Sequence, residues 1–308
     1  MGMDRWNGAV KGRSLARRGL RARACHVRRD DEGAAGVVAI LLSILVVLLL
    51  VTLITSVWMP VWMKDREARH SRTAASDFGN IKAMIDNQVL QGDTNFIMAT
   101  PLTLGTEGVP IVGSDTTGTF SINYFRGDVP EFYCNIRNQS GQLNVTATGG
   151  MKYSSNNRDY VDQELAYENG AILLMQDENE QVIKVGPQFT VERLGPTVKV
   201  SFVLITVSGV ETSMEGVGTV LIRTQLITYT SSQNSFVSAQ WLNLTMITEY
   251  PDAWFRYFND QLVEIGLVPG VDFEETITGT APKVLNVHIA KVKYFDLGYA
   301  LIESSLEA

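Results

Sequence analysis

The 308-residue sequence has few residues of the kinds that build metal, redox or covalent-catalytic sites. It contains two cysteines and three histidines, and only His288 lies beyond residue 92. A single histidine there excludes a site built from several histidine ligands. The sequence also lacks Walker, Rossmann and G-x-S-x-G motifs. We therefore expect neither an enzyme activity nor a cofactor or bound metal.

The cysteines, Cys25 and Cys134, flank a long uncharged run, so we expect them on opposite sides of a membrane and unable to pair. Cys134 is predicted to be a small buried apolar residue rather than a reactive thiol. Together with His288 it makes a formal catalytic pair, but no local signature supports that interpretation. The acidic residues at 272–275 lack the spacing of a calcium loop.

Charge is scarce and unevenly placed, since charged residues make up 19% of the chain. Residues 1–29 carry nine Lys or Arg and a single acid, Asp4, whereas residues 34–308 carry 17 bases and 29 acids, a net charge of −12. Contact with nucleic-acid phosphates requires clustered Lys and Arg. The acidic C-terminal part therefore predicts a protein that has no nucleic-acid partner.

Residues 33–63 form a run of 31 residues without a charge. A bilayer span needs about 20 apolar residues, and a secretory signal has a shorter apolar region of about 7–15 residues followed by a small-residue cleavage site. Trp58 and Trp62 stand where an interfacial aromatic belt is expected. Because the bases precede the run, we predict a cytoplasmic region over 1–33, a transmembrane helix over 34–63 in contact with lipid, and an extracellular C-terminal domain.

Residues 64–92 read as an amphipathic extension of this helix, with apolar residues three or four positions apart. Gln91, Gly92 and Asp93 are predicted to end it, and Pro60 to kink its junction with the apolar run. The apolar face must pack either on the chain's own C-terminal domain or on neighbouring copies. It consists of Ala74, Phe78, Ile81, Ile85 and Val89.

Residues 93–308 alternate between apolar and polar side chains, which is typical of strands. A helix is predicted over 251–265, starting with Pro251 and ending at Gly266, with an apolar face that packs on a sheet or forms a groove. Turns are predicted at 139–141, 149–150 and 154–157. Strands are expected at Thr119–Phe125, Phe132–Ile136, Gln142–Thr148, Ala171–Met175, Gln188–Glu192, Val198–Val207, Gly218–Thr230, Ser235–Leu244 and Lys283–Val292.

The expected fold class is α+β and mainly β. A long N-terminal transmembrane helix precedes a β-sandwich-like extracellular domain with one packed helix. Three N-glycosylation sequons lie in this domain, about as many as chance allows, and their candidate acceptors are Asn138, Asn144 and Asn243.

Residues 28–42, Arg-Arg-Asp-Asp-Glu-Gly-Ala-Ala-Gly-Val-Val-Ala-Ile-Leu-Leu, resemble the class III signal peptide of archaeal type IV pilin-like proteins, which include pilins and archaellins. Two further segments, residues 165–176 and 248–254, are similar to segments of uncharacterised members of that class. The chain differs from bacterial pilins in having no Glu at the fifth position of the mature chain, and it lacks the Ser-Pro that commonly follows the archaeal cleavage point.

This resemblance implies that a prepilin-type peptidase cuts between Gly33 and Ala34, and that the retained helix anchors the protein or packs with copies of itself or other pilin-like subunits. The implied function is a structural or adhesive surface protein, as a filament subunit or minor pilin. Three alternatives stay open: an uncleaved signal anchor, a tethered ligand-binding or enzymatic module, and a structural component of an envelope complex.

Overall fold

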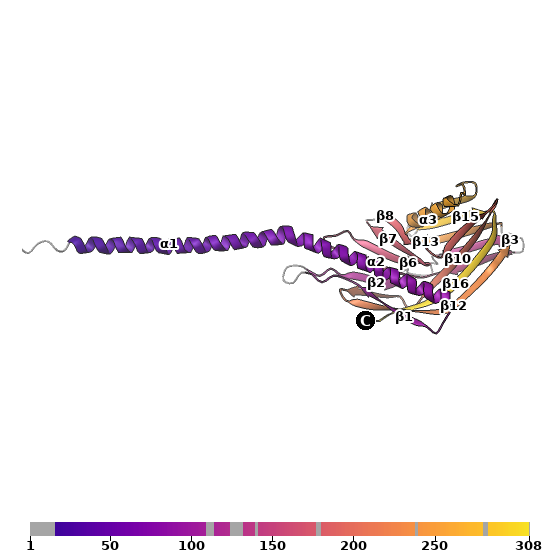
Figure 1. Ribbon diagram of the computed structural model, residues 1–308, viewed down its shortest axis with the longest axis horizontal. Coiled ribbons are helices and arrows are strands. Elements are labelled where there is room, and N and C mark those ends of the chain that lie inside the picture. The colour runs from indigo at the N-terminus through magenta and orange to yellow at the C-terminus, as the bar shows by residue number, and fades with distance from the viewer. Residues whose placement is uncertain are drawn as a thin grey trace, which may run out of the picture. The chain divides into compact units, whose positions relative to one another are not determined.

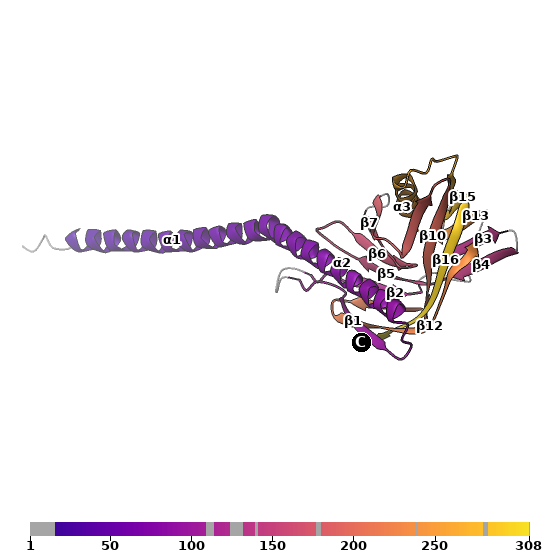
Figure 2. The same cartoon turned by 45° about the vertical axis from the view of Figure 1, so that its right-hand side comes forward.

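The computed structural model describes residues 16–108, 114–123, 132–138, 141–176, 180–237, 240–279 and 283–307. The chain divides into two compact units, residues 1–60 and 61–308. The described part is α+β and mainly β, as the sequence predicts, with one long apolar helix near the N-terminus. Figures 1 and 2 show the elements of the second unit from two directions.

The first unit contains helix α1 (Ala16–Leu53) and a π-helical turn η1 (Ile54–Trp58). The backbone N–H of Met59 donates to the carbonyl of Ile54, five residues back, as in a π-helix. Pro60, at the predicted junction, has no N–H to donate to the carbonyl of Ser56. We attribute the π turn at this point to that missing donor, since such turns commonly accommodate an interrupted helical ladder.

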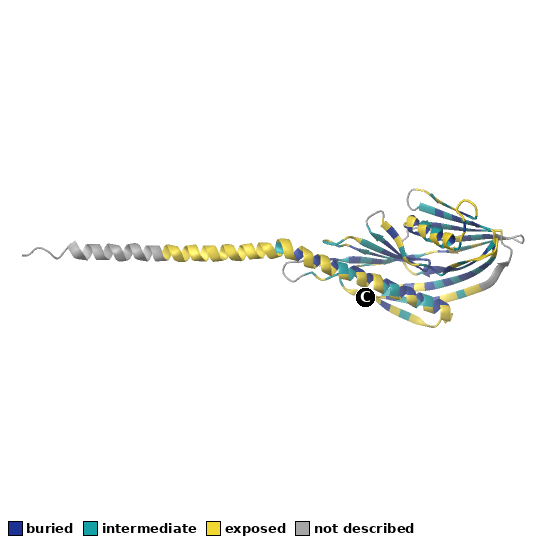
Figure 3. Cartoon of the chain, turned by 45° about the horizontal axis from the view of Figure 1, so that its top comes forward, coloured by how far each residue is buried: buried dark blue, intermediate teal, exposed yellow. Residues whose placement is uncertain are grey.

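Residues 33–58 of the apolar run are exposed in this structure apart from half-buried Thr55, and Figure 3 shows most of this stretch in yellow. Leu49, for example, is 61% exposed. The hydroxyl side chains of this run form hydrogen bonds within the helix. Those of Ser43, Thr52 and Ser56 each donate to the backbone carbonyl four residues earlier, at 2.8, 2.8 and 2.6 Å. The helix is therefore long and apolar enough to cross a membrane, as a signal sequence would also be. Its hydroxyl groups need no hydrogen-bond partner outside the helix.

Helix α2 (Met59–Gln91) places its predicted apolar face inside the second unit. Ala74, Phe78, Ile81, Ile85 and Val89 are at most 1% exposed. The helix packs on the chain's own strands, which decides between the two partners that the sequence left open. Gly92 follows it with φ of 65°, a left-handed conformation that lets glycine end a helix at low cost.

The strands form three sheets. Sheet one contains, in spatial order, β1 (Ile97–Thr103), β12 (Thr219–Val237), β16 (Val292–Glu307), β10 (Thr197–Ser208) and β9 (Phe189–Leu194). Sheet two contains β11 (Thr212–Gly216), β2 (Gly118–Ile122), β5 (Gly150–Ser155), β6 (Gln163–Glu168), β7 (Ala171–Gln176) and β8 (Glu180–Val185). Sheet three contains β14 (Phe273–Thr278), β15 (Lys283–Ala290), β13 (Trp241–Thr248), β3 (Phe132–Asn138) and β4 (Gly141–Ala147).

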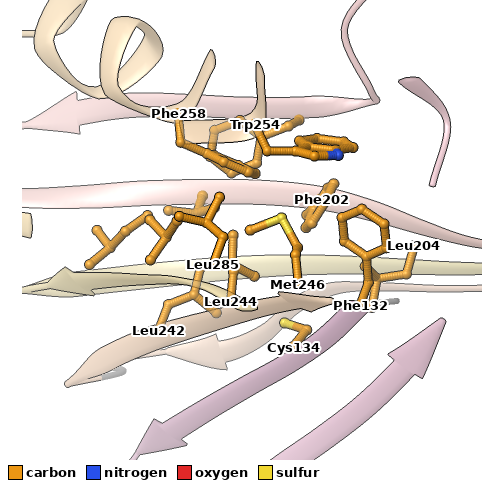
Figure 4. Close-up of a cluster of buried hydrophobic side chains, with 14 of the residues drawn as sticks. Phe132, Cys134, Phe202, Leu204, Leu242, Leu244, Met246, Trp254, Phe258 and Leu285 are labelled. Atoms are coloured by element: carbon orange, nitrogen blue, oxygen red, sulfur yellow. The ribbon is translucent and has the colours of Figure 1, made fainter. Parts of the chain in front are cut away.

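Two hydrophobic clusters hold these sheets together. The α2 core joins the buried face of α2 to sheets one and two, where the rings of Phe78 and Phe120 meet edge to face at 6.1 Å. The α3 core joins helix α3 (Pro251–Glu264) to sheet three, with Trp254 and Phe258 over Leu244 and Leu285 (Figure 4). Strand β10 contributes to both clusters, because neighbouring positions of a strand face opposite sides.

Helix α3 confirms the predicted start at Pro251, and Gly266 with φ of 82° follows its end. The predicted strand Ser235–Leu244 is wrong, because β12 ends at Val237 and β13 begins at Trp241. The 238–240 segment has no Gly, Pro, Asn or Asp, so the sequence carries no turn signal there.

Other predicted boundaries also differ, and β12 continues to Val237, past the predicted end at Thr230. Strand β2 ends at Ile122, before a bend at Asn123 with φ of 52°, and Phe125 lies outside the described residues. The turn predicted at 154–157 is partly wrong, because Ser154 and Ser155 pair with β6. Strand β15 ends at Ala290, since Lys291 adopts φ of 58°. Of the turn predicted at 139–141, residues 139 and 140 lie outside the described part.

Candidate functional site

The predicted processing point lies in an exposed part of α1. Gly33 and Ala34 are both exposed, and nothing lies within 4 Å of the position that a Cβ on Gly33 would take. The described surroundings of this bond are therefore open.

The two segments at 165–176 and 248–254 meet around a buried carboxylate. Glu168, at the end of β6, is fully buried. Its Oε2 accepts hydrogen bonds from Thr248 Oγ1 at 2.7 Å and from Trp254 Nε1 at 3.1 Å. A buried carboxylate is costly unless donors satisfy it, so these bonds tie β6 to the start of α3.

A second set of polar groups continues from this carboxylate toward the surface. Lys152 Nζ lies 3.3 Å from a carboxylate oxygen of Glu164 and 2.8 Å from one of Glu249. Burial lowers the pKa of Lys152, but the two carboxylates outweigh that effect and raise it above its ordinary value. Tyr250 bonds to Glu164, and burial followed by the nearby carboxylates raises the pKa of the Tyr250 hydroxyl well above its usual range.

These groups make a closed connection between strands and α3 rather than an open site. Glu168, Thr248 and Trp254 are fully buried, so a dissolved ligand has no access to the central carboxylate. The sequence did not reveal this cluster, because its partners lie 80 and 86 residues from Glu168. The two segments therefore share a structural task in this fold.

Cys134 and His288 lie on opposite faces of sheet three. Cys134 is 2% exposed in the α3 core, where Figure 4 labels it, and burial raises the pKa of its thiol to about 12. His288 lies in a half-buried position on the other face, and its Nδ1 is 2.5 Å from Asn243 Oδ1. The sheet separates the two side chains, so this arrangement does not form a Cys–His pair.

The face of sheet three that carries His288 is open and polar. Two rows of side chains cross all five strands in register, because the antiparallel pairs align them. The described side chains in these rows are exposed or half-buried. The first row is Glu274, His288, Asn243, Asn135 and Asn144, and the second is Thr276, Asn286, Thr245, Tyr133 and Thr146.

Cross-strand hydrogen bonds order this face. Thr245 Oγ1 donates to Asn286 Oδ1 at 2.8 Å, and His288 bonds Asn243 as described above. The Oδ1 atom of Asn135 is buried and has no hydrogen-bond partner among the described residues. A shallow depression of about 420 Å³ lies over this part of the sheet, lined by Tyr133–Asn135, Asn144–Thr146, Asn243 and Thr245.

The comparisons with known protein families, curated proteins and solved structures find no match. Among the described residues, no group of three or more His, Cys, Asp or Glu side chains could hold a metal ion.

All three candidate glycosylation acceptors belong to sheet three. Asn144 lies exposed on β4, an edge strand, whereas Asn243 lies half-buried on β13, the central strand. Asn138 ends β3, and its side chain lies outside the described residues. Asn144 is thus the more accessible of the two described acceptors.

Proposed function

We propose that this chain is a membrane-anchored cell-surface protein of the archaeal type IV pilin-like class, in which the β-rich unit acts outside the membrane as a structural or adhesive subunit. The observation that carries the proposal is the continuous helical run from residue 33 to residue 91, which changes character along its length. Its first part is exposed and uncharged, and its last part has an apolar face buried among strands.

This division of one helix supports a role as an anchor. An exposed apolar surface of this length is unfavourable in water, so the first part requires lipid or other apolar helices around it. Lipid and a bundle of similar helices are about equally apolar, so the same segment suits a bilayer and a filament core. The α2 part needs no such partner, because its own strands cover it.

Removal of the basic segment over residues 1–33 would allow the apolar helix to pack in a filament core. Residues 1–33 contain nine bases and four acids, so their loss removes a net charge of +5. Unpaired charges cost several kcal/mol in an apolar surrounding, so the uncut segment opposes packing among other helices. The proposal therefore includes cleavage near Gly33 by a prepilin-type peptidase.

The test is protease treatment of intact cells that express the chain with one epitope before Trp6 and another after Glu307. We expect the C-terminal epitope to be digested and the membrane-retained chain to begin within about three residues of Ala34 by mass spectrometry. Gly33→Leu is the matched variant for the cleavage, and it should keep the N-terminal epitope.

Two results would count against parts of this proposal. An N-terminal epitope that external protease reaches contradicts the orientation. A mature chain that retains Arg28 and Arg29 identifies an uncleaved signal anchor and removes the argument for filament assembly.

A further inference from the structure

We propose that the polar face of sheet three, centred on Asn135 and Asn243, binds an uncharged glycan. The inference deepens the proposed surface function, on which it rests for its place of action, because it gives an adhesive domain a ligand class. The face is defined by the two five-residue rows described above, together with Trp241 on the same side of β13.

The amide side chains supply the recognition chemistry. Asn135, Asn144, Asn243 and Asn286 each carry an amide that can both donate and accept in one plane, as pairs of neighbouring sugar hydroxyls require. The cross-strand bonds use the Oδ1 atoms of Asn243 and Asn286, which leaves their Nδ2 groups without a partner among the described residues. These groups are already oriented, so binding costs little further ordering.

Asn135 Oδ1 is one of nine buried side-chain polar atoms that have no hydrogen-bond partner among the described residues, and it is the one of them that lies on this face. An unsatisfied buried acceptor normally costs about 1–3 kcal/mol. Asn135 lies between Asn243 and Asn144 in the first row, at the depression of about 420 Å³. Because this Oδ1 is closed to solvent, a sugar hydroxyl would donate the missing hydrogen bond once a neighbouring side chain turns aside.

Aromatic side chains border the amides. Trp241 is half-buried with its ring 6.0 Å from that of His288, and Tyr133 is 37% exposed in the second row. Aromatic planes pack against the C–H faces of sugar rings while their polar atoms stay wet. Neighbouring strands lie about 4.8 Å apart, so a row across five strands spans about 19 Å, enough for a short oligosaccharide.

The polarity of the face argues against a protein partner, and its charge is sparse. Glu274 is the only Asp, Glu, Lys or Arg in the two rows, and the register places one base, Arg137 of β3, opposite Trp241 beside them. Binding of a polyanion normally needs clustered Lys and Arg. A stable protein interface normally has an apolar centre, whereas the centre of this face consists of Asn and Thr side chains.

The experiment uses the full chain, produced in a bacterial host that does not glycosylate Asn144 or Asn243 and purified in a detergent without a sugar headgroup. The probes are linear tetrasaccharides of glucose, mannose, galactose and N-acetylglucosamine, each compared with a sulfated counterpart. Saturation-transfer NMR and calorimetry measure binding. We expect at least one uncharged probe to bind more tightly than its sulfated form.

Three variants test the location. Asn135→Val and Trp241→Ala should each weaken binding by about tenfold or more, whereas Thr190→Ala, on exposed β9 in sheet one, should not. Asn135→Val also removes the unsatisfied acceptor, so its melting temperature should stay equal or rise. A purely structural Asn135 would instead lower the melting temperature.

The proposal is overturned if no uncharged probe binds, if the sulfated probes bind better, or if Asn135→Val and Trp241→Ala bind as well as the unchanged chain. None of these results affects the protease and mass measurements, which test anchoring and cleavage separately.

Discussion

The carboxylate of Glu67 fixes α2 to a turn of the β-rich unit. Glu67 is fully buried, and its two oxygens accept the backbone N–H groups of Arg158, Asp159 and Tyr160 at 3.1, 2.8 and 2.7 Å. Charge-assisted bonds of this kind are stronger than neutral ones. One side chain thus satisfies three donors that the sheets do not use.

We expect Glu67→Ala to lower the free energy of unfolding by about 2 kcal/mol, because three partly buried N–H groups lose their acceptor. Chemical denaturation measures the change. The control is Asp65→Ala on the same helix, whose exposed ion pair with Arg69 should be worth less than about 0.5 kcal/mol. Equal effects of the two substitutions would contradict the assignment.

Glu275 gives a pH-dependent prediction. Burial raises the pKa of this half-buried carboxyl to about 7, more than the hydrogen bond from Asn259 lowers it, and Asp260 adds to the rise. The folded state therefore holds the proton more tightly than the unfolded chain. The stability that the protonated group contributes is present below its ordinary pKa of 4.5 and is lost as the pH rises through about 7.

Glu275→Gln should accordingly raise the melting temperature at pH 8 and change it little near pH 4, since glutamine resembles the protonated acid at all pH values. Thermal unfolding across this range measures the difference between variant and unchanged chain. Glu274→Gln, exposed on the opposite face of the same strand, is the control and should show no such trend. A stabilisation that is equal at both pH values would disprove this explanation.

At the scale of elements, α2 belongs to the fold of the second unit. A chain that starts at Val61 keeps every α2 residue of the α2 core, whereas a chain that starts at Asp93 loses five buried side chains. Each large apolar side chain removed from a core costs about 2–5 kcal/mol, which together exceeds the usual stability of a domain.

We therefore expect the chain from Val61 to be soluble, with a cooperative thermal transition by circular dichroism, and the chain from Asp93 to be aggregated or molten. A cooperative transition in the shorter chain would show that the strands fold without α2.

The elements that the sequence predicted best are those with local signals. The period of Phe78, Ile81 and Ile85 identified the buried face of α2, and Pro251 marked the start of α3. Strand β6 was missed because it ends in Glu168, an acid whose burial depends on Thr248 and Trp254 far along the chain. Local periodicity carries no information on such a partner.

At the scale of the whole molecule, the candidate face was predictable only in part. The alternation in 283–292 already placed Asn286 and His288 on one side of a strand. Their alignment with Asn243 and Asn135 depends on the order and register of β15, β13 and β3, which pair His288 with Asn243, 45 positions away, and Asn243 with Asn135, 108 positions away. Sequence alone does not fix that register, since several offsets preserve the alternation.

The place of β16 in sheet one has a consequence for when the fold can be completed. This strand is synthesised after every other described strand, yet it lies between β12 and β10 and pairs with both. Sheet one therefore cannot close while the chain is still leaving the ribosome. On the membrane topology proposed above, sheet one would be completed only on the far side, once β16 has crossed.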